Sequence, residues 1–421
     1  KGRFPTYDKL NEEINKYQLS LFKPSIYVRP QFKDQYQGEA NVRNFSQEKR
    51  EQFLIGMMKV NFLKRLESSV KSFAITMERT VDKIEDLEER LKGYQQLRDG
   101  KAEDLQATLF LMEAEEDEEL REAFEVGSLK YRMEHMDVDR WLADLAADKR
   151  QLSMLAESAG GVGPERDAKL ATLKTIIDKQ VTQPGTNQHG ETNRKVIVFC
   201  AFADTATYLY EQLESWAKQT LKVHIALVSG GARPNRSTFG AADFNQILTN
   251  FAPRAKQRHK MPQMPQDGEI DILIATDCIS EGQNLQDCAL LVNYDIHWNP
   301  VRIIQRFGRI DRIGSLNDSI QLINFWPTPD LNKYINLKNR VEARMALVDI
   351  AATNEDNVLT HSELEELIHQ DLKYRDKQLI RLKDEVLDLE DFNESVALNE
   401  FTLDDFRMDL NNHLAANHTL L

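Results

Sequence analysis

The sequence predicts an α/β fold, in which a doubly wound parallel sheet is flanked by large α-helical regions. Short apolar runs alternate with amphipathic helical stretches over residues 191–330, and one of these runs ends abruptly in polar residues. Long amphipathic stretches on both sides carry dense charge of both signs. We therefore expect a helical region over residues 1–190, a sheet-containing lobe over residues 191–330 and a C-terminal α-helical brace over residues 331–421.

The expected strands of the lobe are Lys195–Cys200, Val223–Val228, Ile272–Ala275, Ala289–Val292 and Ile320–Phe325. Helices are expected over residues 204–217 and 244–251, and a third begins at Pro300, where a first-turn proline is tolerated. Thr276 and Asp277 follow the apolar run that starts at Ile272. A parallel strand that turns polar in this way ends at a ligand crevice, so the sequence places a site there.

The N-terminal third is expected to be mostly helical. Residues 47–92 carry an apolar stripe, and the basic side of this helix consists of Lys59, Lys64, Arg65 and Lys71. Residues 78–158 favour antiparallel helices that form an accessory bundle. We expect residues 1–50 to be a linker with an extended run at Ser25–Arg29, and the glycine-rich stretch at 160–164 to end the helices.

Composition restricts the class of protein. The chain has 421 residues, of which 41% are hydrophobic and 29% charged, and no run approaches the ~18 apolar residues that a membrane span needs. Three cysteines lie in or beside apolar strands without metal-ligand or disulfide spacing, which favours buried reduced thiols in a cytosolic protein. The net charge is −14, but acidic residues are concentrated outside the lobe, so nucleic-acid binding is not excluded.

Arginines gather on the helix that begins at Pro300. Arg302, Arg306 and Arg309 recur at i, i+4 and i+7, which places them on one face near Gln305. Like charges at this spacing repel, so an acidic neighbour or a bound polyanion should balance them. Phosphate is the favoured ligand, and a solvated basic face is the alternative.

At these residues the sequence resembles superfamily-two helicases. Ala275-Thr276-Asp277, Glu281-Gly282 and Asn284-Leu285 resemble motif V, and the run from Gln305 to Arg312 resembles motif VI. Tyr294-Asp295 with Trp298-Asn299-Pro300 narrows the resemblance to Swi/Snf-type translocases of double-stranded DNA. Arg306 and Gly308 depart from the eukaryotic string and are similar to bacterial members such as the RNA-polymerase-recycling ATPases. The resemblance implies a RecA-like C-terminal motor lobe.

The resemblance also implies residue roles. The catalytic residues would be Arg309 and Arg312, as arginine fingers, together with Gln305, which would help to align the nucleotide. The ATP-binding residues would be Gly282, Asn284 and Asp277. The DNA-backbone contacts would be Phe202, Asp204, Thr205, Ser229, Gly230, Thr276, Ser280 and Glu281. No metal ligand is expected in this lobe.

The phosphate-cradling half of such a motor is not found in the sequence. No G-x-x-x-x-G-K-[ST] run occurs, and no strand ends in the acidic pair that would hold Mg²⁺. The expected protein is therefore a fragment that begins with a linker from a first motor lobe, which would hold most of the ATP and Mg²⁺, and we expect the fragment alone to be inactive. The expected partners are double-stranded DNA, the first lobe and, through the helical regions, other protein subunits, in the cytoplasm of a bacterium and close to its nucleoid.

Two other functions remain open at this stage. One is a lobe of a superfamily-two helicase that acts on RNA or single-stranded DNA. The other is a non-catalytic scaffold that keeps the lobe as a protein-binding platform, although a scaffold has no need for both Arg309 and Arg312.

Overall fold

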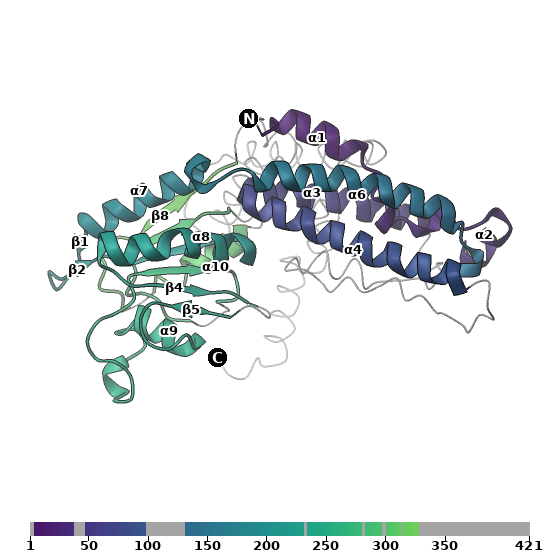
Figure 1. Ribbon diagram of the computed structural model, residues 1–421. Helices are drawn as coiled ribbons and strands as arrows, with labels where there is room; N and C mark the ends of the chain where they lie inside the picture. The colour runs from purple at the N-terminus through teal and green to yellow at the C-terminus, as the bar shows by residue number, and fades with distance from the viewer. Residues whose placement is uncertain are drawn as a thin grey trace, which may run out of the picture.

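The computed structural model describes residues 4–37, 47–97, 131–230, 234–279, 283–296, 300–312 and 314–327. Within them, a helical bundle lies beside an α/β lobe (Figure 1). The bundle contains α1 (Tyr7–Lys16), α2 (Lys33–Gln37), α3 (Gln47–Ser68), α4 (Val70–Leu97) and α6 (Val138–Gly160). The predicted C-terminal brace, residues 331–421, lies outside the described residues.

The lobe is built on a mostly parallel sheet. Its strands are β3 (Val196–Phe199), β4 (Ile225–Val228), β5 (Arg236–Ser237), β6 (Ile272–Ala275), β7 (Leu290–Asn293) and β8 (Gln321–Asn324). In the described residues they take the order β5-β4-β6-β3-β7-β8, and β5 is antiparallel to β4 at one edge. The central β3 pairs in parallel with both neighbours, with Val196 opposite Ile272 and Leu290.

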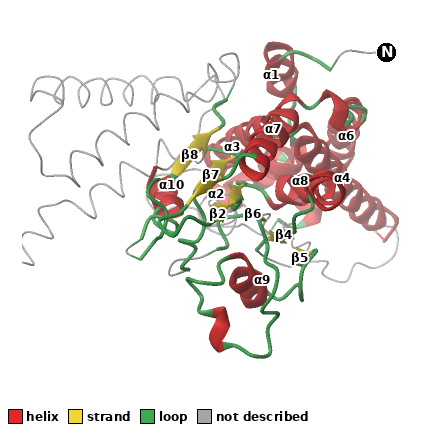
Figure 2. Ribbon diagram, turned by 90° about the vertical axis from the view of Figure 1, so that its left-hand side faces the viewer, coloured by secondary structure: helices red, strands yellow, loops and turns green. Residues whose placement is uncertain are grey.

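Helices cover both faces of this sheet (Figure 2). Val196 and Val198 point to the face covered by α7 (Ala168–Thr182) and α8 (Ala203–Trp216), while Ile197 and Phe199 point to the face covered by α9 (Phe244–Phe251). Because both faces are buried, the central strands β3, β4 and β6 are apolar throughout, as predicted. The predicted α/β fold with a doubly wound parallel sheet is confirmed, and α7 packs with the sheet although the predicted boundary at residue 191 separates them.

The N-terminal segment is folded into the bundle, contrary to the expected linker. Leu10 and Ile14 of α1 are fully buried in the apolar core of the bundle. The expected extended run at Ser25–Arg29 is instead largely a 3₁₀ helix, Pro24–Tyr27, because Pro24 presets the first helical position. The ring of Tyr27 stacks on Trp141 of α6, with centroids 5.3 Å apart.

Two buried carboxylates hold this segment in place. Asp148 of α6 accepts hydrogen bonds from Ser20 N at 2.7 Å and Ser20 Oγ at 2.5 Å. Glu51 of α3 accepts from Ser25 N at 3.0 Å and from the Tyr131 hydroxyl at 2.8 Å. Buried acids that are satisfied in this way fix the path of an irregular chain, because an unpaired carboxylate would be costly.

A sharp bend at Ser69 joins α3 to α4. The C-terminal end of α3 and the N-terminal end of α4, which we call the elbow, rest on the lobe. Ser69 separates the two helices, and its Oγ accepts a hydrogen bond from Ser72 N at 2.9 Å, as an N-capping serine does. Ile296 and Ile303 of the lobe are buried in the apolar core of the bundle. The lobe and bundle thus share a core beside the elbow. Of the helices that the structure describes, none has the length and apolar character needed to cross a lipid bilayer.

Candidate functional site

The carboxyl ends of three parallel strands meet at one edge of the sheet. Thr276 and Asp277 follow β6, Asp295 follows β7, and Ala201 follows β3. The Ala201 amide donates to the Asp295 carboxylate at 3.0 Å. The edge predicted to carry a ligand site therefore brings together side chains from segments that are far apart in the sequence.

Arg306 of α10 (Pro300–Phe307) is the buried cation of this edge. Its Nε and one terminal nitrogen donate to the two carboxylate oxygens of Asp277, both at 2.7 Å. Its other terminal nitrogen donates to Asn293 Oδ1 at 2.8 Å and to the Asp295 carbonyl at 3.1 Å. The arginine spacing predicted an acidic neighbour or a polyanion, and for Arg306 the neighbour is Asp277. Both oxygens of Asp277 are thereby engaged, so its place in the ATP site stays a prediction.

The motif VI residues after α10 lie against motif V. The Leu285 amide donates to the Arg309 carbonyl at 3.0 Å. Arg312 donates from Nε to the Gly308 carbonyl at 2.9 Å, and it also hydrogen-bonds Asn284 Oδ1. Arg309 is 6% exposed, whereas Gln305 and Arg312 are half-buried. The two predicted fingers and Asn284 are thus neighbours, and their roles in catalysis and nucleotide binding stay predictions.

The elbow covers three residues predicted to contact DNA. Asp204 and Thr205 are 3% and 0% exposed, and Phe202 lies under the Arg65 guanidinium, 4.2 Å from the ring centroid. Asp204 accepts hydrogen bonds from Arg65 and Arg79, each at 2.9 Å. In this arrangement these residues do not face a nucleic acid, because α3 and α4 occupy the strand end.

Arg65 also corrects an expectation about α3. The pattern placed it on the basic side of the helix, yet it is fully buried. The buried carboxylate of Asp204 compensates its charge, and the ring of Phe202 covers its flat face.

The other predicted backbone contacts lie at the ends of β4 and β6. Gly230 N donates to Thr276 Oγ1 at 3.3 Å, so the two strand ends are joined. A Cβ at Gly230 would lie 2.8 Å from the Cys278 Cβ, which makes glycine necessary for this close approach. Ser229 Oγ is buried and has no hydrogen-bond partner among the described residues. Ser280, Glu281 and Gly282 lie outside the described residues, as does Trp298.

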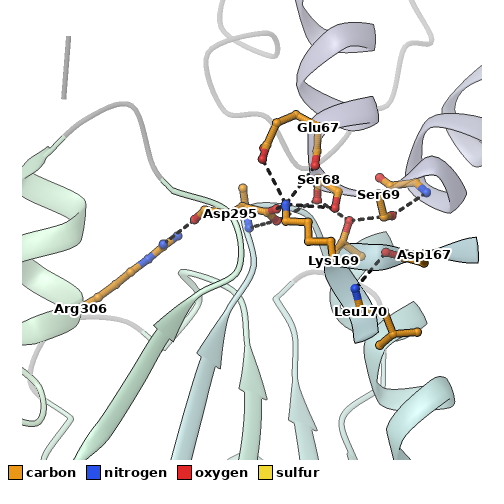
Figure 3. A network of polar contacts seen from close by, with 11 residues as sticks. Glu67, Ser68, Ser69, Asp167, Lys169, Leu170, Asp295 and Arg306 are labelled. Carbon is orange, nitrogen blue, oxygen red and sulfur yellow. Dashed lines mark hydrogen bonds and ion pairs between the residues drawn. The ribbon is translucent and has the colours of Figure 1, made fainter. Parts of the chain in front are cut away.

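Sequence reasoning missed a partly buried network centred on Lys169 (Figure 3). The Lys169 ammonium donates to the Glu67 carboxylate and to the Asp295 carboxylate, both at 3.1 Å. It also donates to the carbonyls of Glu67 at 2.9 Å and Ser68 at 3.3 Å, at the C-terminal end of α3. Ser68 Oγ donates to Asp295 at 2.8 Å and shares a hydrogen bond with Thr205 Oγ1. Lys169 therefore fastens the elbow to the end of β7.

The Lys169 ammonium pairs with two carboxylates, those of Glu67 and Asp295. Burial works against the charged Lys169, but Glu67 and Asp295 outweigh it and raise its pKa. Burial also raises the pKa of Glu67, to about 7, and the charge of Asp295 adds to the rise while Lys169 opposes it. Glu67 is therefore the carboxyl of this network whose pKa is raised into the neutral range.

We predict that Glu67→Gln removes a pH dependence of stability. The folded-state pKa lies above that of the unfolded chain, so the folded form binds an extra proton between about pH 4.5 and pH 7. This contribution to the free energy of unfolding, at most about 3 kcal/mol, is fully present below the unfolded pKa and is lost as the pH rises through 7. Urea unfolding between pH 5 and pH 8 measures the difference between the wild type and the variant.

Glu85→Gln is the matched control for this prediction. Glu85 lies on α4 in a largely exposed pair with Lys149, so its replacement should leave the pH dependence unchanged. A Glu67→Gln protein that loses stability with rising pH as steeply as the wild type would contradict the assignment.

The thiols of the lobe are poor nucleophiles. Cys200 and Cys288 are buried free thiols, as expected, and Cys278 is partly exposed. Burial raises the pKa of all three thiols above its usual value. Among the described residues, no three His, Cys, Asp or Glu side chains form a group that could hold a metal ion.

Comparison with known families agrees with this geometry. Residues 168–314 match the helicase conserved C-terminal domain. This segment is therefore similar to the C-terminal domain of helicases. It contains the whole parallel sheet except β8, and it includes both the strand-end edge and the arginines after α10.

Curated relatives match shorter stretches. Over 51 residues the chain is 53% identical to YqhH of Bacillus subtilis strain 168, an uncharacterized ATP-dependent helicase, covering 12% of this chain and 9% of that protein. Over 95 residues it is 33% identical to the ATP-dependent RNA helicase DBP8 of Candida albicans, covering 23% and 20%. The matched stretches thus span a fifth or less of the length of these two relatives.

Solved structures resemble the chain only distantly. The C-terminal part of the Fun30 ATPase domain has a TM-score of 0.31 at 12% identity, covering 80% of this chain and 87% of that one. S. cerevisiae Dbp5 bound to RNA and ADP BeF3 has a TM-score of 0.27 at 18% identity, covering 41% and 36%. Both TM-scores are too low to support an inference about function.

Proposed function

We propose that the chain supplies the second motor lobe of an ATP-dependent translocase of Swi/Snf type that moves on double-stranded DNA. The observation that carries this proposal is the meeting of motif V with motif VI. Arg306 pairs with Asp277, Arg312 hydrogen-bonds Asn284, and the Arg309 carbonyl accepts from Leu285 N. A protein-binding platform requires none of these contacts, whereas a lobe that must present two arginines to a nucleotide requires the segment to be held.

In the proposed mechanism, this lobe stabilises the negative charge of the nucleotide phosphates. Arg309 and Arg312 stabilise negative charge that builds on the terminal phosphate during its transfer to water, and Gln305 helps to align the nucleotide. Asn284 lies beside Arg312, where it orients the guanidinium or the ribose. A first motor lobe in the intact protein holds most of the ATP and the Mg²⁺. Cationic and amide side chains on this lobe fit such a phosphate-facing role.

We propose fewer DNA-contacting residues than the resemblance implies. Ser229, Gly230 and Thr276 lie together at the ends of β4 and β6, where the Ser229 hydroxyl has no partner among the described residues and could donate to a phosphate oxygen. The strand end at Phe202 is covered by the elbow, so the elbow would have to move before that end could reach DNA. Backbone contacts suit a translocase, because reading base edges would halt it at particular sequences.

A comparison of ATPase rates tests the proposal. We expect the purified 421-residue chain to hydrolyse no ATP above background, and the intact protein to hydrolyse ATP faster when duplex DNA is added. Stimulation should be indifferent to sequence and should weaken with salt, because phosphate contacts dominate the affinity. ATPase rates of both proteins, measured with two unrelated duplexes and a single-stranded RNA at two salt concentrations, supply the data.

The outcomes separate the candidate functions. Stimulation by the RNA but not by either duplex would replace the translocase with an RNA helicase. Strong preference for one duplex would contradict a backbone-tracking motor. An intact protein that neither binds nor hydrolyses ATP would favour the scaffold.

A further inference from the structure

The loop that follows α9 brings a lysine to the two helicase motifs. Asp287, two residues after the motif V leucine, accepts hydrogen bonds from Arg254 N at 2.8 Å and Ala255 N at 2.9 Å. Arg258 anchors the other end of this loop, because its buried guanidinium donates to Asn250 at 3.1 Å. The lysine between these anchors, Lys256, is therefore held by the fold.

The backbone beside this lysine adopts an uncommon conformation. Gln257 has φ 52° and ψ 42°, in the left-handed region that non-glycine residues seldom occupy. Such a conformation costs on the order of 1–3 kcal/mol and persists only where surrounding contacts impose it. Here the bonds of Asp287 and Arg258 impose it, and the result is a fixed position for Lys256.

Lys256 and Arg312 bond to two consecutive residues of the motif V segment. The Lys256 ammonium hydrogen-bonds Gln283 Oε1, and Arg312 hydrogen-bonds Asn284 Oδ1. The two side-chain acceptors are consecutive and uncharged, and within the described residues neither cation pairs with a carboxylate. Burial, and next the charge of Arg312, lower the pKa of Lys256. Two cations that repel each other across a pair of amides form a site at which both would attract a bound anion.

We propose that Lys256 is a second cation for the phosphate group that binds beside Arg312. This inference rests on the proposed function, in which Arg312 faces the terminal phosphate of the nucleotide. Lys256 lies outside motifs V and VI, on a loop that also carries Arg254, Arg258 and Lys260. A phosphate of the nucleic-acid backbone has the same chemistry, and the experiment distinguishes the two sources.

Chemical labelling tests the contact without relying on activity. In the intact protein, acetylation of Lys256 by an N-hydroxysuccinimide ester is followed by mass spectrometry, with a non-hydrolysable ATP analogue, with duplex DNA, or with neither. We expect the analogue to slow acetylation of Lys256 while that of Lys260 is unchanged. Protection by DNA alone would identify a backbone phosphate as the ligand. Absence of protection by either would overturn the proposal.

Kinetics supply the second measurement. Lys256→Gln should lower kcat about 10²-fold, the scale for removing one donor to a developing charge. Lys260→Gln is the matched control, because Lys260 is exposed on the same loop and donates only to Gln257 among the residues that the structure describes. Lys256→Arg should retain activity and move the alkaline fall of kcat to higher pH, since arginine stays charged. If Lys256 were purely structural, Lys256→Arg would not change the pH at which kcat falls.

The two proposals fail differently. If the wild type hydrolyses ATP with DNA stimulation and Lys256→Gln behaves as Lys260→Gln does, only the role of Lys256 is wrong. If the wild type neither binds nor hydrolyses ATP, both the proposed motor function and the proposed role of Lys256 are wrong.

Discussion

Replacing Arg309 or Arg312 by alanine in the intact protein is expected to lower kcat about 10³-fold or more, the scale for arginine fingers in phosphoryl transfer. The KM for ATP should change far less, because the proposed first lobe would make most of the contacts to the ground state. Arg309→Lys and Arg312→Lys should rescue poorly, since an ammonium cannot reproduce the planar fork of donors. The measurement is DNA-stimulated ATPase activity over a range of ATP concentrations.

Arg236→Ala is the control for both fingers. Arg236 lies on the edge strand β5, where it pairs with the partly exposed Glu214 at 3.2 Å, so its loss should leave kcat unchanged. Arg309 is 6% exposed, so circular dichroism must show that its variant is folded. A folded Arg309→Ala enzyme with near-normal kcat would refute the assignment and favour the scaffold.

The sequence pattern predicted the lobe well because apolar strand runs and helical spacing involve residues that are close together in the chain. The central strands β3, β4 and β6 are apolar throughout, since helices cover both faces, and this pattern alone placed them. Helical spacing also predicted that the α10 arginines require a balancing charge. For Arg306 that charge is Asp277, 29 positions earlier in the chain.

The residues that the sequence could not place are those whose partners are distant. Asp204 opens α8 at the end of a strand, a position that suits a ligand contact, yet its partner Arg65 lies 139 positions away. Nothing in the pattern of α3 distinguishes Arg65 from the basic residues around it. Lys169 likewise stands in an ordinary amphipathic helix, and only packing of the elbow brings Glu67 and Asp295 to it.

The strand-end contacts connect the elbow to the motifs. Asp295 receives Lys169 and Ser68 from the elbow side at its carboxylate, and its carbonyl accepts from Arg306 on the other side (Figure 3). Arg306 continues to Asp277 in motif V. The hydrogen bonds between the elbow and motif V therefore run through Asp295 and Arg306, and the pair of Arg306 with Asp277 is the last step of this route.

Arg306→Met is expected to cost about 3–5 kcal/mol of the free energy of unfolding, the scale for removing one partner of a buried ion pair. Arg306 is 1% exposed, and its loss would remove one hydrogen bond from Asn293 Oδ1 and two from the Asp277 carboxylate. Asp277 retains 28% exposure, and water will offset part of the loss, so we expect a value near the lower end. Urea unfolding monitored by tryptophan fluorescence gives the measurement, with Arg236→Met expected to change stability by less than about 0.5 kcal/mol.

A double-mutant cycle decides whether the loss belongs to the pair. Asp277→Leu alone leaves the buried Arg306 guanidinium with Asn293 and the Asp295 carbonyl as acceptors, whereas the double variant Arg306→Met/Asp277→Leu leaves no charge uncompensated. The double variant should therefore be more stable than the sum of the single losses predicts, by roughly 1–3 kcal/mol. Its ATPase activity should nevertheless stay low, because motif V is no longer held against motif VI. Additive losses would mean that Arg306 acts through packing alone, and the elbow would then have no charged route to motif V.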